Sequence, residues 1–187
     1  RVSDPKTFDY VDALQEISHL PEVILNKLSV EYKRYNVSGG MPAAVVALLD
    51  NRGMHVLESE LQSILDLYEL DFSKYAEPLQ VTRIRNLWHS LPAQLSKENR
   101  KFIYRVIRSG ARSKDYEDAL MWLEDAGMIY KVTNISKPGL PLSAYEEDAF
   151  KVYACDCGLL RRLARVPAEV VLSGHVGYTE FKGAMAE

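Results

Sequence analysis

Apolar residues recur at intervals of three and four through the first half of the chain, and prolines and glycines interrupt them. This spacing places the apolar side chains on one face of a helix. Proline is favoured in the first turn of a helix, so several prolines mark helix starts. We therefore expect helices after Asp4-Pro5, from Pro21 to Asn36, from Pro42 to Leu49, over Val56–Tyr68, and around Leu79–Trp88, ending before Pro92.

The pattern changes after Leu91. We expect, in order, a helix with Phe102 and Ile107 on its apolar face and a break at Gly110, a helix from Ser113 to Gly127, a strand over 128–135, a Pro/Gly-rich turn over 136–142, and a strand over 149–154. Ser113 is a suitable N-cap for the second of these helices. The order is that of a winged helix-turn-helix. The predicted fold class is mainly α, a helical bundle followed by a winged helix-turn-helix with a small β-hairpin wing.

Composition narrows the class of protein only a little. The 187 residues are 47% hydrophobic and 26% charged, with a net charge of −3, so a packed core is expected and a generally basic, nucleic-acid-binding surface is not. No apolar run is long enough to cross a bilayer and no signal peptide is evident, which favours a cytoplasmic protein without membrane contact. Cys155 and Cys157 stand too close for an easy disulfide and have no second pair for zinc, so we interpret them as half-buried residues in a reducing compartment.

The motifs of hydrolytic enzymes are missing from the sequence. It contains no G-x-x-x-x-G-K-[ST] and no H-E-x-x-H, and its histidines, at positions 19, 55, 89 and 175, are scattered. We therefore expect no catalytic residues, no metal site and no cofactor in this chain, and no hydrolysis by it alone.

The turn at Ser38-Gly39-Gly40-Met41-Pro42 is the most suggestive local feature. Two glycines permit positive φ and close backbone approach, and the proline presets the next helix. Exposed N–H groups at such a helix start suit a phosphate or contact with an adenine ring. The alternative, favoured by spacing alone, is a helix–helix turn without a ligand.

Charge argues against sequence reading by the winged helix. The expected recognition helix, 113–126, has one lysine and five acidic residues, whereas the segment 97–108 has five basic residues and one glutamate. DNA affinity depends on neutralising phosphates, so docking to protein is favoured over DNA, and the opposite charges of the two segments could also satisfy each other. Candidate contacts to nucleic acid or a partner are Arg100, Lys101, Arg105, Arg108, Arg112, Lys114, Lys131 and Lys137.

Several strings, taken together, resemble one family. They are Tyr35-Asn-Val-Ser-Gly-Gly-Met-Pro42, then Tyr68 with Asp71-Phe-Ser-Lys-Tyr75, then Ser109-Gly-Ala-Arg-Ser-Lys-Asp-Tyr through Met128-Ile129, and Phe150-Lys-Val-Tyr153 with Asp156-Cys-Gly-Leu-Leu160. In order and spacing they resemble the region after the ATPase core of a prokaryotic AAA-type P-loop ATPase family, including its C-terminal domain of unknown function. The resemblance runs from about Phe8 to the end.

This resemblance implies that some functions of the parent protein are carried by segments outside the chain. An upstream P-loop core would bind ATP and Mg, residues 1–90 would form its helical lid with Gly39, Gly40, Met41 and Pro42 near the nucleotide, 91–165 would be the winged-helix domain, and 166–187 a helical tail. Phe181–Ala184 would lead to a nuclease-like domain. Arg1 in place of Met also suggests a piece of a longer protein. The expected function is regulation and coupling within an ATPase, with docking by the winged helix; the alternative is a DNA-binding module acting through 97–112 and the wing.

Overall fold

The computed structural model describes residues 6, 9, 11, 20–50, 52–96, 101–137, 139–142, 146–174 and 183. Within these residues it has eight helices and one antiparallel two-stranded sheet. They are α2 (Glu22–Ser38), α3 (Pro42–Leu49), α4 (Met54–Tyr75), α5 (Pro78–Leu95), α6 (Tyr104–Ile107), α7 (Ser113–Asp125), β1 (Ile129–Ile135), β2 (Glu146–Ala154), α8 (Cys157–Leu163) and α9 (Ala168–Ser173). The mainly helical class with a hairpin is confirmed. Most of the helix expected after Asp4-Pro5, and the tail beyond Gly174 except residue 183, lie outside the described residues.

Prolines and glycines set the helix boundaries much as expected. Pro42 and Pro78 are the first residues of α3 and α5, and Pro21 is the N-cap of α2. At these positions the N–H that proline lacks would have no helical partner, so nothing is lost. Gly39 and Gly53, both with positive φ, separate α2 from α3 and α3 from α4.

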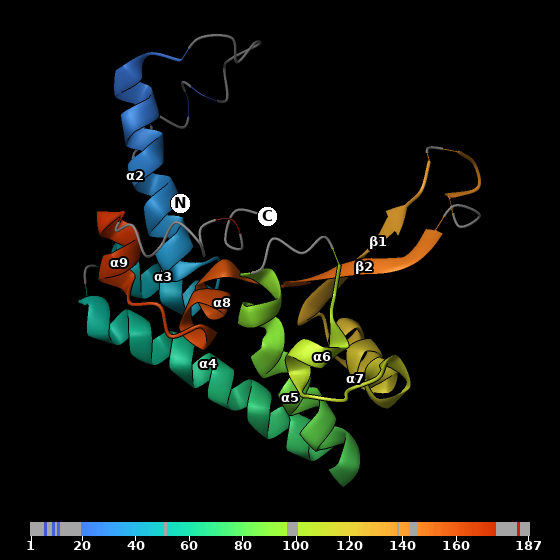
Figure 1. The fold of residues 1–187 in the computed structure, drawn as a ribbon. Coiled ribbons are helices and arrows are strands. Elements are labelled where there is room, and N and C mark those ends of the chain that lie inside the picture. The colour runs from blue at the N-terminus through green and yellow to red at the C-terminus, as the bar shows by residue number, and fades with distance from the viewer. Residues whose placement is uncertain are drawn as a thin grey trace.

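The helices pack around α4 and α5 (Figure 1). α3 packs on α4, α7 packs on α5, and α8 contacts α2, α4 and α5. The buried leucines of α4, at positions 57, 61 and 65, recur every four residues and line one face. The last two helices therefore return to cover the first half of the chain, and α9 packs on α2. The division at residues 90 and 165 stays a prediction.

One helix end was predicted wrongly. α5 does not stop before Pro92 but continues through it to Leu95. Proline near the end of a helix removes a single N–H, and the last turn here is held by other contacts. Leu91 is fully buried, and the Gln94 side chain bonds both the N–H and the carbonyl of Ile103, at 3.1 and 2.8 Å.

The helix expected around Phe102–Ile107 is also corrected. Only the four residues of α6 are helical, because Phe102 binds the sheet instead. Its N–H donates to the Phe150 carbonyl at 2.6 Å, and the two rings stack. Lys97–Arg100 lie outside the described residues. Ser113 is the first residue of α7 rather than its cap; Arg112 takes the cap position without a side-chain bond.

The hairpin forms as the sequence predicts, although β2 begins earlier than position 149. Ile129 pairs with Ala154 and Lys131 with Val152, so the base of the hairpin is buried while its far end projects from the helices (Figure 1). A search of the described helices for one long and apolar enough to cross a bilayer found none.

Candidate functional site

The Gly39–Pro42 turn joins the end of α2 to the start of α3. Gly39 has φ of 65°, and its N–H donates to the Tyr35 carbonyl at 2.7 Å, which closes α2. Gly39 is buried, whereas Gly40 and Pro42 are exposed and Met41 is half-buried. The turn thus has a buried anchor and an outer edge of small and apolar groups.

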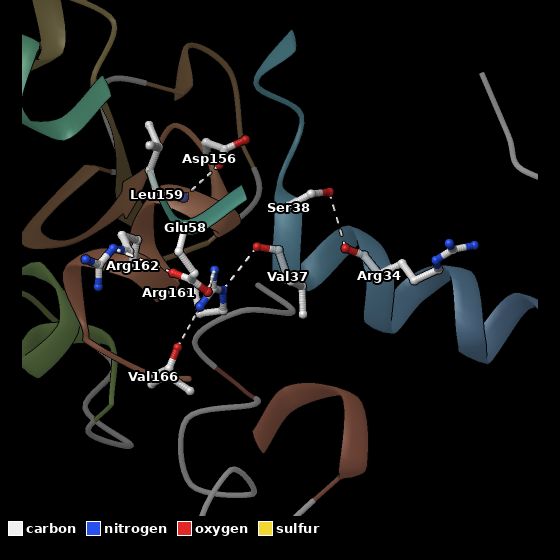
Figure 2. Close-up of polar contacts among 9 residues, drawn as sticks. All are labelled: Arg34, Val37, Ser38, Glu58, Asp156, Leu159, Arg161, Arg162 and Val166. Carbon is white, nitrogen blue, oxygen red and sulfur yellow. Dashed lines mark hydrogen bonds and ion pairs between the residues drawn. The ribbon is translucent and has the colours of Figure 1, made fainter. Parts of the chain in front are cut away.

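Asp156 holds this turn from the other end of the chain. Its carboxylate accepts from the Gly40 N–H at 2.6 Å through Oδ2 and from the Leu159 N–H at 2.8 Å through Oδ1. The second bond caps α8, for which aspartate is a preferred N-cap (Figure 2). Because Asp156 is 7% exposed and both oxygens are used, one buried side chain links two backbone segments.

Two glycines make this link sterically feasible. A Cβ on Gly39 would overlap Oδ1 of Asp156, and a Cβ on Gly158 would overlap the Ser38 carbonyl oxygen. Gly40 differs, since its Cβ would lie 3.7 Å from Asp156 Oδ2, an ordinary contact. Close backbone approach is therefore required at Gly39 and Gly158 and not at Gly40.

Arg161 fixes α8 to α2 one turn further on. It is fully buried, and its guanidinium donates to the Val37 carbonyl at 3.0 Å and to the Val166 carbonyl at 2.7 Å. Val37 is in the last turn of α2, where carbonyls lack helical partners and a cation is favoured. Arg161 thereby satisfies the end of one helix and the loop that follows another.

Glu58 of α4 balances the buried charge. Its Oε1 lies 2.8 Å from Arg161 Nη2, and its Oε2 lies 3.6 Å from Nε of the neighbouring Arg162 (Figure 2). Glu58 is 27% exposed and Arg162 30%, so the second pair is formed by two partly exposed side chains. α2, α4 and α8 therefore meet at one ionic centre beneath the turn.

Asp156, Arg161 and Glu58 together form what we call the Asp156 joint. Cys155 and Cys157 flank Asp156 as free, half-buried thiols, which confirms their predicted burial. Burial, with a smaller contribution from the Asp156 charge, raises the pKa of each thiol to about 11. Cys157 Sγ lies 3.6 Å from the Tyr35 carbonyl. Neither thiol is activated as a nucleophile, because activation requires a lowered pKa.

The arrangement distinguishes between the two ligands considered for the turn. The Gly40 N–H already has a carboxylate partner, and that negative charge disfavours a phosphate at the same place. The exposed Gly40–Pro42 edge presents carbon, which suits the face of an adenine ring. The described residues contain no group of three or more His, Cys, Asp or Glu placed to hold a metal.

The basic candidates occupy several elements. Lys101 precedes α6, Arg105 is in it, Arg108 and Arg112 lie between α6 and α7, Lys114 is in α7, Lys131 in β1 and Lys137 in the turn of the hairpin; all seven are exposed, and Arg100 lies outside the described residues. Lys131 Nζ sits 4.8 Å from the centre of the Phe150 ring.

The sequence analysis assigned no role to the three charged residues of the Asp156 joint, which are Asp156, Arg161 and Glu58. Asp156 had a readable signal, because aspartate before a short apolar helix is a typical N-cap. Its second partner, Gly40, is 116 residues away, and no local pattern indicates such a pairing.

These features define a mainly helical protein with a projecting hairpin, in which a buried carboxylate holds a glycine turn whose outer edge is exposed. The chain belongs to the family of the domain of unknown function DUF8612, whose model matches residues 29–170. The match begins in α2 and ends in α9, so it includes the turn, Asp156, Arg161 and the hairpin. Comparisons with curated proteins and with solved structures found no match.

Proposed function

We propose that this chain is the regulatory lid and coupling portion of an AAA-type ATPase. In the parent protein an upstream P-loop core would bind ATP and Mg, and the exposed edge of the Gly39–Pro42 turn would contact the nucleotide base. The winged-helix part would dock on a partner or on a downstream nuclease-like domain. The chain itself would carry no hydrolytic residues.

The observation that carries the proposal is the bond from the Gly40 N–H to Asp156. Asp156 stands between the end of β2 and the start of α8, so a displacement of the turn would act on both. At 2.6 Å to a buried carboxylate, the bond is short and charge-assisted, which makes the connection stiff. A turn that merely joined two helices would not require it.

The family resemblance supports coupling between the turn and the winged-helix part. The strings that carry it include the turn and the Asp156–Leu160 segment, and these two strings are in direct contact. Allosteric coupling requires two sites and an element whose equilibrium both sites bias. Here the turn would be one site, the docking surface of the winged helix the other, and the Asp156 joint the shared element.

The first test measures ATP turnover and nucleotide affinity of the parent protein with Gly40→Val or Pro42→Ala. Both changes alter the exposed edge, and the space beside Gly40 admits a side chain. We expect weaker nucleotide binding and altered turnover. Pro78→Ala is the matched control, because Pro78 is also the exposed first residue of a helix. Turnover and affinity equal to those of the control would remove the turn from the nucleotide site.

The second test separates contact from coupling with Asp156→Asn. Asparagine keeps one acceptor oxygen and the shape but loses the charge and one of the two accepted bonds. We expect nucleotide affinity close to wild type and a smaller effect of nucleotide on the winged-helix part, measured as the change in its amide exchange on adding ATP. An undiminished nucleotide effect in a folded variant would refute the coupling role.

DNA binding is the second candidate, favoured by the exposure of the seven described basic residues around α6, α7 and the hairpin. It predicts that the chain binds duplex DNA with an affinity that falls steeply as salt rises. No binding at about 50 mM salt, where phosphate contacts are strong, would eliminate it.

A further inference from the structure

An open cavity of about 370 Å³ lies where α4, the end of α7 and the start of β1 meet. It is lined by Tyr68, Asp71, Trp122, Asp125, Ala126 and Met128. Two aromatic rings and two carboxylates thus share one concave site, and none of the lining residues is basic. It lies apart from the Gly39–Pro42 turn, whose residues do not line it.

The aromatic walls are held in place from behind. Trp122 meets the fully buried Phe72 edge-to-face at 5.5 Å between ring centres, and Tyr68 meets the buried Trp88 edge-to-face at 6.1 Å. Rings fixed by the core need no ordering when a ligand binds, which lowers the cost of binding. The floor, Met128, is also buried.

The charge around the cavity is negative and lacks a local counter-charge on α7. Asp71 and Asp125 are exposed at its edge, and the last turn of α7 carries Glu124 and Asp125 without a basic residue. The end of a helix already has negative potential from its unpaired carbonyls, so acidic residues there are unfavourable unless a cation is supplied.

We propose that this cavity binds an organic cation, a guanidinium or an alkylammonium group. The faces of tryptophan and tyrosine attract such cations, and carboxylates at the rim give charge-assisted hydrogen bonds to their N–H groups. Two carboxylates are too few for a hard metal ion, which takes six or more oxygen ligands. The negative rim excludes nucleotides and other anions.

The cavity adjoins the segment that leads to Asp156. The Met128 carbonyl accepts from the Cys155 N–H at 3.0 Å, and the pKa of Tyr68 is raised by its burial and then by the nearby charges of Cys155 and Asp156. A cation in the cavity would therefore sit beside the strand end that connects the hairpin to α8. Its binding requires neither nucleotide nor an ATPase core.

The test is a titration of the whole chain, followed through the indole N–H signals of Trp122 and Trp88 by NMR. The probes are acetyl-arginine amide, which represents a side chain presented by a protein, and agmatine, which represents a free small cation. The uncharged acetyl-citrulline amide is the control. We expect the Trp122 signal to shift with at least one cationic probe while the buried Trp88 moves less.

Matched variants decide whether the cavity is responsible. We expect Asp125→Asn and Asp71→Asn each to weaken binding about tenfold, the size of one charge-assisted contact. Asp118→Asn removes the same charge from α7 but does not line the cavity, so it should leave binding unchanged. Binding of the citrulline probe equal to that of the cations, equal binding by all three variants, or no shift of Trp122 at millimolar probe would each overturn the proposal.

Discussion

Replacing Arg161 by methionine tests whether α8 is fixed to the rest of the fold by its buried guanidinium. Methionine retains an unbranched apolar stem like that of arginine but removes the guanidinium and all its hydrogen bonds. The carbonyls of Val37 and Val166 then lose their donors inside the protein. Hydrogen bonds to charged groups contribute about 1.5–3 kcal/mol each, so the loss should reach at least about 3 kcal/mol.

The Glu58 ion pair adds less to this loss. Glu58 is 27% exposed, so water can solvate its carboxylate after the guanidinium is removed. The total cost of Arg161→Met should therefore be about 3–5 kcal/mol, which is a large share of the ~5–15 kcal/mol stability of an ordinary domain.

Urea unfolding followed by tryptophan fluorescence measures this cost, with an unchanged m-value as the check for two-state behaviour. Arg162→Met is the control: the residue is adjacent and shares Glu58, but it is 30% exposed and its contact is 3.6 Å. A long contact between two partly exposed side chains contributes little, about 1 kcal/mol. If the two variants lost equal stability, the buried guanidinium would not hold α8 as described.

Four further outcomes follow from the same geometry. Gly39→Ala should cost about 2 kcal/mol or more because of its positive φ and the overlap of its Cβ, whereas Gly40→Ala should change stability by less than about 0.5 kcal/mol in thermal unfolding. Cys155 and Cys157, with pKa values near 11 instead of 9, should react with iodoacetamide at pH 8 about a hundredfold more slowly than an unperturbed thiol, measured by mass spectrometry. Because the folded pKa lies above the unfolded one, these thiols favour the fold fully below pH 9 and progressively less as pH rises towards 11; stability rising over that range would contradict the assignment. Gln94→Ala should cost about 1–2 kcal/mol and speed amide exchange in the segment before α6, since both bonds to that segment are lost; unchanged exchange there would count against this role.

Local patterns predicted the elements better than their partners. Pro42 marks the start of α3 because its missing N–H costs nothing there, and the β-rich stretches around Ile129 and Phe150 mark the hairpin. The helix α5 continues through Pro92 because the burial of Leu91 and the two hydrogen bonds of the Gln94 side chain outweigh one lost helical hydrogen bond. Local propensity is a weak guide wherever packing of this kind decides.

The candidate site was predicted only in part. The glycines at 39 and 40 indicate a close approach, but they do not say what approaches. That answer, the Asp156 carboxylate, comes from a residue whose local pattern indicates only an N-cap, and its partner Gly40 is 116 residues away. Arg161, in turn, reads as a surface arginine of a short helix, and only the tertiary fold shows that it is buried.

The return of α8 and α9 to the first helices has a consequence for how the protein is made. While the chain emerges from the ribosome, the faces of α2 and α4 that α8 contacts have no cover until the stretch after the hairpin has been synthesised. Contacts that join residues more than a hundred positions apart form late and slow the folding of a chain. The ribosome-bound intermediate would thus expose the carbonyl end of α2 and the α8-facing side of α4, which makes it a substrate for chaperones until Gly158 reaches Ser38.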